Sequence, residues 1–261
     1  MRESVDSLAV IRRNLASIAS GRLLSANKRV ATGHLALDAA LDGGLALGRV
    51  HELFAAEPGD EPSAIGFAAM IALRMIGRDL PIFWLRSDEA CRRGGQLHAP
   101  GLIELGGDPD ALVLGQAADT RALLKSASDA ARCPGLKALI VECWGKCPEL
   151  DLTVSRRLAL AAEKSGVTLF LLRLEAEPLP SAADTRWSVS AAPSHPLEAD
   201  APGPPMFEIE LLRRRSGPSG MRWRLEWDRD QIIFREPAHI GAVVPLPAGR
   251  PVAADPWRLS A

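Results

Sequence analysis

The chain contains no tyrosine, and aromatic residues make up only 5% of its 261 residues. It also lacks an apolar run near the roughly 20 residues that span a bilayer. Its first residues mix charges of both signs, whereas a signal peptide has an apolar centre. From these absences we expect a cytoplasmic protein without membrane contact.

Excess charge of either sign is also missing, because 31 Lys and Arg residues oppose 32 Asp and Glu residues. A net charge of −1 gives no general attraction to nucleic acid, so any contact driven by charge must be local. Of the four cysteines, Cys143 and Cys147 lie in CWGKC and Cys133 lies nearby. Without a second cysteine pair or a neighbouring histidine, we expect no metal site and reduced, structural cysteines.

The chain is organised around residues 48–77, which read as a strand over Arg49 to Ala55, a tight loop and an apolar helix entered at Pro62. In P-loop nucleotide-binding domains the same element carries G-x-x-x-x-G-K-[ST], whose amides and lysine hold the phosphates. Here all four defined positions differ: Ala55 and Asp60 replace the glycines, Glu61 replaces the lysine and Pro62 replaces the hydroxyl.

Shifting the pattern by one residue places Gly59 at the second glycine but puts Asp60 at the lysine position. A carboxylate there turns an attraction of roughly 4 kcal/mol into a repulsion of similar size. Pro62 also lacks the N–H and hydroxyl that a phosphate and its metal would use. We therefore expect a P-loop scaffold that binds no nucleotide or other cofactor and has no ATPase activity. An ordinary strand-loop-helix with an accidental likeness is the alternative.

Strands and helices alternate through the first two thirds of the chain, which predicts right-handed crossovers and a parallel sheet. A short helix within 31–44 ends at the Gly43-Gly44 pair. The expected strands span 49–55, 81–86, 111–115, 137–142 and 167–173, and the expected helices between them include 119–132 and 150–165.

Beyond Pro178 the pattern changes to alternating apolar and polar residues, which favours half-buried antiparallel strands that extend one edge of the sheet. These strands span 187–191, 206–212, 221–227 and 231–235. Apolar residues at helical spacing over 3–20 predict an amphipathic helix. We therefore divide the chain into an N-terminal helical segment (1–30), an α/β core (31–236) and a flexible, Pro- and Ala-rich tail (237–261).

With GHLALDAALDGGLALGRVHELF placed before the degenerate loop, the sequence resembles the RecA family over Thr32 to about Phe234. A closer likeness is to the ImuA family, RecA-like proteins of a bacterial damage-inducible mutagenesis cassette. The residues that carry it are SRRLALAAEKSG (155–166), SAADTRW (181–187), APS (192–194) and the 210–227 hairpin. The resemblance implies a RecA-like, P-loop NTPase-type fold: a twisted, mainly parallel sheet with helices on both faces and an antiparallel extension.

The family resemblance also implies partners and a role. It implies an accessory factor of translesion synthesis in the SOS response to DNA damage, acting with ImuB, an inactive Y-family polymerase homologue. An error-prone DnaE-type polymerase would join indirectly, and RecA is another candidate partner. The N-terminal helix and the tail are the candidate contact surfaces. A RecA-type NTPase with an unconventional nucleotide site and a SulA-like cell-division inhibitor are the alternatives.

The family's catalytic carboxylates match Asp88 or Glu89 and, at the end of the Walker B strand, Glu142. A helix N-terminus and a structural ion pair are simpler explanations, so we predict no catalytic residue. DNA contact stays open at one basic cluster beside Trp223 and Trp227, although Glu208, Glu210 and Glu226 balance it. The cluster comprises Arg213, Arg214, Arg215, Arg222 and Arg224.

Overall fold

The protein was analysed in a computed structural model that describes residues 28–75 and 80–237. The helix expected over 3–20 and almost all of the expected tail lie outside these residues. None of the helices within the described ranges combines the length and the apolar character needed to cross a bilayer.

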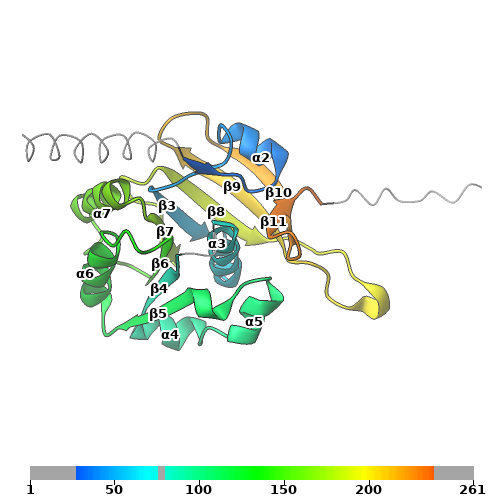
Figure 1. The fold of residues 1–261 in the computed structure, drawn as a ribbon, viewed down its shortest axis with the longest axis horizontal. Helices are drawn as coiled ribbons and strands as arrows, with labels where there is room; N and C mark the ends of the chain where they lie inside the picture. Colours follow the sequence, from blue (N-terminus) through cyan, green and yellow to red (C-terminus); the bar gives the residue numbers. More distant parts are fainter. Residues whose placement is uncertain (1–27, 76–79, 238–261) are drawn as a thin grey trace, which may run out of the picture.

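A nine-stranded sheet forms the centre of the molecule (Figure 1). The strand order is β11-β10-β9-β8-β3-β7-β6-β4-β5, and the six strands from β8 to β5 run parallel. The strands are β3 (Val50–Ala55), β4 (Ile82–Ser87), β5 (Leu112–Ala117), β6 (Ala138–Trp144), β7 (Thr168–Leu174), β8 (Thr185–Ala191), β9 (Met206–Arg214), β10 (Met221–Asp228) and β11 (Ile233–Arg235).

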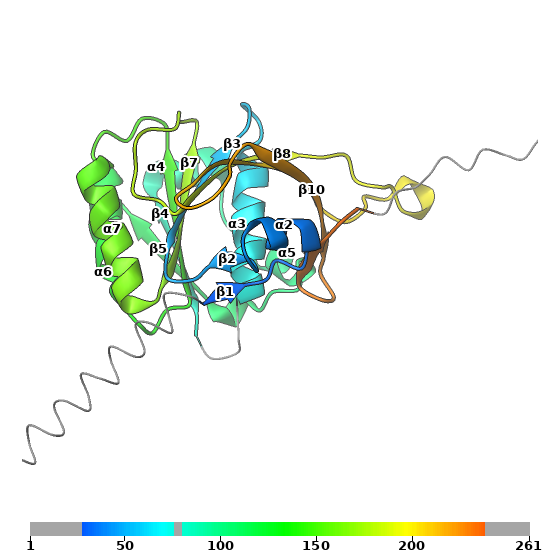
Figure 2. The same ribbon diagram turned by 90° about the horizontal axis from the view of Figure 1, so that it is seen from above.

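Helices cover both faces of the sheet, as expected (Figure 2). Helices α2 (Leu35–Ala40) and α3 (Glu61–Met75) pack on one face, while α6 (Thr120–Ala130) and α7 (Leu152–Ser165) pack on the other. Each face has its own apolar cluster, because every central strand is buried on both sides. Asp119 and Asp151 cap the amino ends of α6 and α7.

Helix α3, which follows the P-loop-like turn, is buried almost all round because the antiparallel strands curl over it. The Phe67 ring lies 5.9 Å from that of Phe207 on β9 and 5.3 Å from that of Phe234 on β11. Trp227 on β10 packs on Phe234 with ring centroids 4.8 Å apart. The antiparallel extension therefore closes the core around α3.

Strand β8 corrects one expectation. It was expected to be antiparallel, but it pairs in parallel with β3, His51 opposite Thr185, and is antiparallel only to β9. Alternating burial along β8 reports that one face is more exposed, and it carries no information about strand direction.

The segment before β3 forms a small unit of its own. Strands β1 (Arg29–Val30) and β2 (Leu45–Ala46) precede and follow α2 in the sequence, and they pair with each other in antiparallel fashion. The Asp38 carboxylate accepts hydrogen bonds from the Thr32 hydroxyl and from the backbone N–H groups of Thr32 and Gly33. Gly44 has a φ of +116°, and a Cβ there would lie 2.1 Å from the Val30 carbonyl oxygen, so a side chain does not fit.

Between β4 and β5 the structure contains two helices, of which only the first was anticipated, by the helix N-terminal interpretation of Asp88 and Glu89. They are α4 (Asp88–Gly94) and α5 (Ala99–Glu104), and a 3₁₀ turn, η1 (Pro109–Ala111), follows. Both helices are short, and no residue of α5 is buried. A helix without a buried apolar face leaves little periodic signal in the sequence.

Candidate functional site

The P-loop-like turn connects the end of β3 at Ala55 to the start of α3 at Glu61. Its own carboxylates accept hydrogen bonds from backbone amides. Asp60 accepts from the N–H of Glu57 at 3.3 Å and from the N–H of Ala191 at 2.9 Å. Glu61 accepts from the N–H of Gly59 at 2.8 Å. In a nucleotide-binding P-loop, amides at such a turn point at phosphate.

No cation compensates these acids within the described part of the chain, since neither Asp60 nor Glu61 has an ion-pair partner there. Pro62 follows in the first turn of α3. The turn therefore combines internally bonded amides with uncompensated negative charge, and both features disfavour a phosphate.

Glu142, at the Walker B position on β6, is fully buried. Its carboxylate accepts hydrogen bonds from the indole N–H groups of Trp84 at 2.8 Å and Trp144 at 3.2 Å. Arg86 Nε on β4 lies 2.9 Å from Glu142 Oε1, an ion-pair contact too oblique for a hydrogen bond. The side chain thus makes the structural ion pair that was the simpler explanation for it.

The arginine of this pair is fixed as well. Arg86 donates to the carbonyl oxygen of Gly95 at 2.7 Å and to that of Ala90 at 3.2 Å, which ties β4 to α4. Arg86 and the two tryptophans were not predicted from the sequence. An arginine at the end of an otherwise apolar strand could have indicated this pair, because a buried cation requires a buried carboxylate.

The acids after β4 lie at the amino end of α4, which Ser87 caps. Asp88 accepts a hydrogen bond from the Gln116 amide at 2.6 Å. Hydrogen bonds from Arg92 and Arg93 lower the pKa of Glu89. Asp88 and Glu89 both have protein partners in the helix N-terminal position that was the simpler explanation.

Two of the four cysteines lie together at the end of β6: Cys143 is in the strand and Cys147 is in the turn that follows. A hydrogen bond between Cys143 and Cys147 raises the pKa of Cys143, which burial raises further, and lowers the pKa of Cys147 to about 7. All four thiols are free, with Cys133 exposed. Among the residues that the structure describes, no three or more His, Cys, Asp and Glu side chains are grouped to hold a metal ion.

The arginine-rich hairpin of β9 and β10 carries positive charges beside negative ones. Arg222 lies 2.7 Å from Glu210, and Arg224 lies 3.8 Å from Glu208. Trp227 is buried in the core under Phe234. The hairpin therefore presents paired charges on its outer face.

Arg213 and Arg214 contact other parts of the protein and do not gather with the hairpin arginines. Arg214 donates to the Ala40 carbonyl oxygen at 2.6 Å and pairs with Asp42, which joins β9 to the end of α2. Arg213 donates to the Ser181 carbonyl oxygen at 3.2 Å. Four of the five arginines of the predicted cluster thus have separate partners, and among the described residues the side chain of Arg215 makes no hydrogen bond or ion pair.

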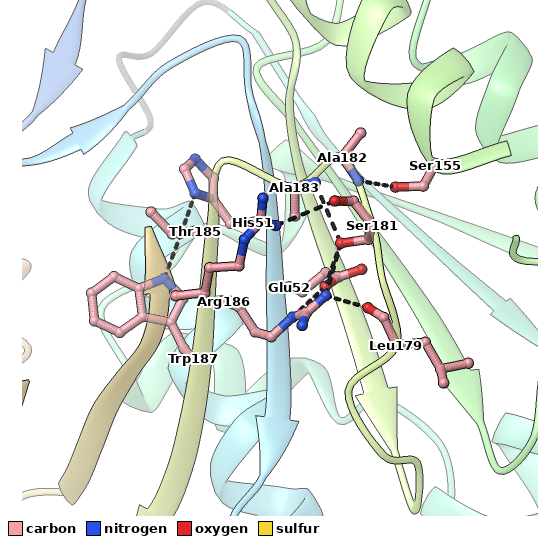
Figure 3. A network of polar contacts seen from close by, with 11 residues as sticks. His51, Glu52, Ser155, Leu179, Ser181, Ala182, Ala183, Thr185, Arg186 and Trp187 are labelled. Carbon is pink, nitrogen blue, oxygen red and sulfur yellow. Dashed lines mark hydrogen bonds and ion pairs between the residues drawn. The ribbon is translucent and has the colours of Figure 1, made fainter. Parts of the chain in front are cut away.

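Residues of the 155–166 and 181–187 segments meet in one polar network (Figure 3). Glu52 on β3 accepts hydrogen bonds from the Ser181 hydroxyl and from Arg186 Nε, both at 2.9 Å. The backbone N–H of Ala182 donates to the Ser155 hydroxyl on α7 at 2.8 Å. The network fixes the β7–β8 connection against the centre of the sheet.

A second branch of the network determines the tautomer of His51. Trp187 Nε1–H donates to Thr185 Oγ at 2.7 Å, and the Thr185 hydroxyl lies 2.7 Å from His51 Nδ1. His51 Nε2 lies 2.8 Å from the Ala46 carbonyl oxygen, which can only accept. Neutral His51 therefore carries its proton on Nε2 and accepts from Thr185 at Nδ1. Burial lowers the pKa of His51 to about 4.

Comparison with known proteins identifies the family. The chain is 34% identical over 193 residues to Protein ImuA of Caulobacter vibrioides strain NA1000, and equally to that of strain CB 15. The match covers 68% of this chain and 75% of each relative. The chain belongs to the ImuA family. No protein-family model matches it.

The fold of this ImuA-family protein is RecA-like, as expected. Its structure is similar to the crystal structure of the RadB recombinase, with a TM-score of 0.54 over 80% of this chain and 100% of that one. At 12% sequence identity the likeness concerns the fold alone. The α/β class, the mainly parallel sheet and the antiparallel extension are confirmed.

Proposed function

We propose that this ImuA-family protein is a non-catalytic, RecA-like accessory factor of an error-prone translesion synthesis complex in the SOS response to DNA damage. It acts through protein contacts and binds no nucleotide or other cofactor. Its direct partner is an ImuB-like inactive Y-family polymerase homologue. RecA is a second partner, and a DnaE-type polymerase joins through the ImuB-like protein.

One observation carries the non-catalytic part of this proposal: the Asp60 and Glu61 carboxylates accept hydrogen bonds from the Glu57 and Gly59 amides of the P-loop-like turn. A phosphate would have to displace them and approach two uncompensated negative charges, with no lysine to attract it. Glu142 adds support. Its carboxylate is buried and already bonded to Arg86 and to two indole N–H groups, so it does not act as a catalytic residue.

Thermal unfolding with Mg-ATP tests the absence of a nucleotide site. If the protein had a nucleotide site, free Mg-ATP at about 100 times its Kd would raise the free energy of unfolding by roughly 2.7 kcal/mol. For a domain of this size that corresponds to a rise in Tm of about 5–10 °C. We expect no shift for the wild type at millimolar Mg-ATP. The variant Asp60→Gly, Glu61→Lys, Pro62→Thr is the matched control, since it restores the glycine, the cation and the hydroxyl. A saturable shift in the wild type would contradict the proposal.

Co-purification tests the partner. The full chain is co-expressed with the ImuB-like protein and, separately, with RecA from the same genome. We expect a stable complex with the ImuB-like protein that persists without nucleotide and through gel filtration. Absence of any complex with the ImuB-like protein would refute the accessory role.

A further inference from the structure

A large apolar groove lies beside the P-loop-like turn, with a volume of about 1180 Å³. Its floor is one side of α3, where the small residues Pro62, Gly66 and Ala69 let a ligand approach the helix closely. Its walls include Trp84 and Trp144 from the carboxyl-terminal part of the sheet. Helix α5 and strand β5 complete it.

The groove walls leave apolar side chains in contact with solvent. Leu114 on β5 is 58% exposed, although β5 belongs to the central sheet. Leu102 and Leu105, in and after α5, also line the groove, and neither is fully buried. An apolar surface of this depth, bordered by polar residues, is typical of a binding site.

The rim of the groove is acidic. Two glutamates and one arginine line it: Glu175 is paired with Arg93, whereas Glu61 has no ion-pair partner among the described residues and leaves an excess of negative charge. Residues 94–120, which supply the α5 and β5 walls, add no lysine or arginine to this lining. The rim therefore repels a phosphate backbone and attracts a basic ligand.

We propose that the groove receives an amphipathic helix of a partner protein, with apolar side chains against α3 and α5 and Arg or Lys residues at the acidic rim. Such a helix places anchors at i, i+4 and i+7, which suits an apolar groove of about 1180 Å³, a volume above the roughly 300–1,000 Å³ of a small-molecule pocket. This inference rests on the proposed accessory role and names the surface that would serve it.

Residues 1–27, where an amphipathic helix is expected, lie outside the described structure, and the self-association outcome of the test below distinguishes them from a separate partner. The described chain begins at residue 28 beside β1 and α2, which Figure 1 places across the molecule from α5. A second copy of the chain would have to bring its basic surface to this rim, and the arginines of the β9–β10 hairpin are already paired. A separate partner with a basic, amphipathic helix would supply both the apolar anchors and the positive charge.

The test uses two labelled helical peptides with identical leucines at i, i+4 and i+7, one flanked by Arg and the other by Glu. We expect saturable, micromolar binding of the Arg peptide to the full chain by fluorescence anisotropy, and at least tenfold weaker binding of the Glu peptide.

Leu114→Glu should weaken Arg-peptide binding at least tenfold. Glu61→Lys with Glu175→Lys should reverse the preference between the peptides. Leu160→Glu is the matched control, because Leu160 is 67% exposed on α7, on the other face of the sheet.

Several results would overturn the inference: no saturable binding of the Arg peptide, equal binding of the two peptides, or equal weakening by Leu160→Glu. Self-association of the wild type that Leu114→Glu abolishes would instead assign the groove to a second copy. Failure here is separate from failure of the proposed function. An ImuB-like complex that tolerates Leu114→Glu refutes the groove alone, whereas absence of that complex refutes the accessory role.

Discussion

Glu142→Gln is expected to lower the free energy of unfolding by about 3–5 kcal/mol, because it leaves the Arg86 charge buried without its counter-ion. The Glu142 and Arg86 side chains are only 0% and 6% exposed, so water cannot compensate the loss. The glutamine keeps a similar shape and one oxygen that can accept from Trp84. Urea unfolding followed by circular dichroism measures the change without relying on the tryptophans at the site.

A double-mutant cycle separates the pair from its surroundings. Arg86→Met with Glu142→Gln should cost less than the sum of the two single substitutions, since removing both partners leaves no buried charge. Glu89→Gln is the matched control: Glu89 pairs with Arg92 and Arg93 at the surface, where solvent screens the charges, so we expect a much smaller loss than for Glu142→Gln. Additive effects in the cycle would show that Glu142 and Arg86 are not coupled.

Stability is expected to fall by about 3 kcal/mol between pH 6.5 and pH 4 because of His51 alone. Its folded pKa of about 4 lies below the ordinary value of 6.5, chiefly because burial disfavours the imidazolium. In this window the unfolded chain binds a proton that the folded protein does not, so acid favours unfolding. Above pH 6.5 the contribution is constant.

The matched variant is His51→Gln, which does not titrate but can still donate to Ala46 and accept from Thr185. Its absolute stability will differ, so the comparison is between the two slopes of unfolding free energy against pH. Between pH 4 and 6.5 we expect the wild-type slope to exceed that of the variant by an amount that corresponds to the uptake of up to one proton on unfolding. Parallel profiles would mean that the folded protein admits a charged His51.

The parallel half of the fold could be read from the sequence because its strands are short apolar runs buried on both faces. Four of the observed parallel strands begin and end within two residues of the expected bounds, which were 49–55, 81–86, 137–142 and 167–173. Strand β8 was misassigned in direction because its alternation reflects partial exposure and not its partner. Helix α5 was missed because it has only six residues and none of them is fully buried.

The functional site was less accessible from sequence. The reversed charge at Asp60 and Glu61 was readable, because the P-loop pattern fixes residue types at fixed spacing. Their hydrogen bonds were not, since Ala191 is 131 residues from Asp60. The groove was hidden for the same reason. Its lining comes from segments between residues 61 and 175, and only the sheet topology brings them together.

The position of β3 has a consequence for how the protein is made. This apolar strand is synthesised early, yet its two neighbours, β7 and β8, emerge much later: Thr185 follows its partner His51 by 134 residues. At about 5–20 residues per second a ribosome needs roughly 7–27 s to make that stretch. For most of this time both edges of β3 lack their native partners, because β7 is also made only at residues Thr168–Leu174. The nascent chain therefore depends on protection from aggregation, and the core forms only near the end of translation.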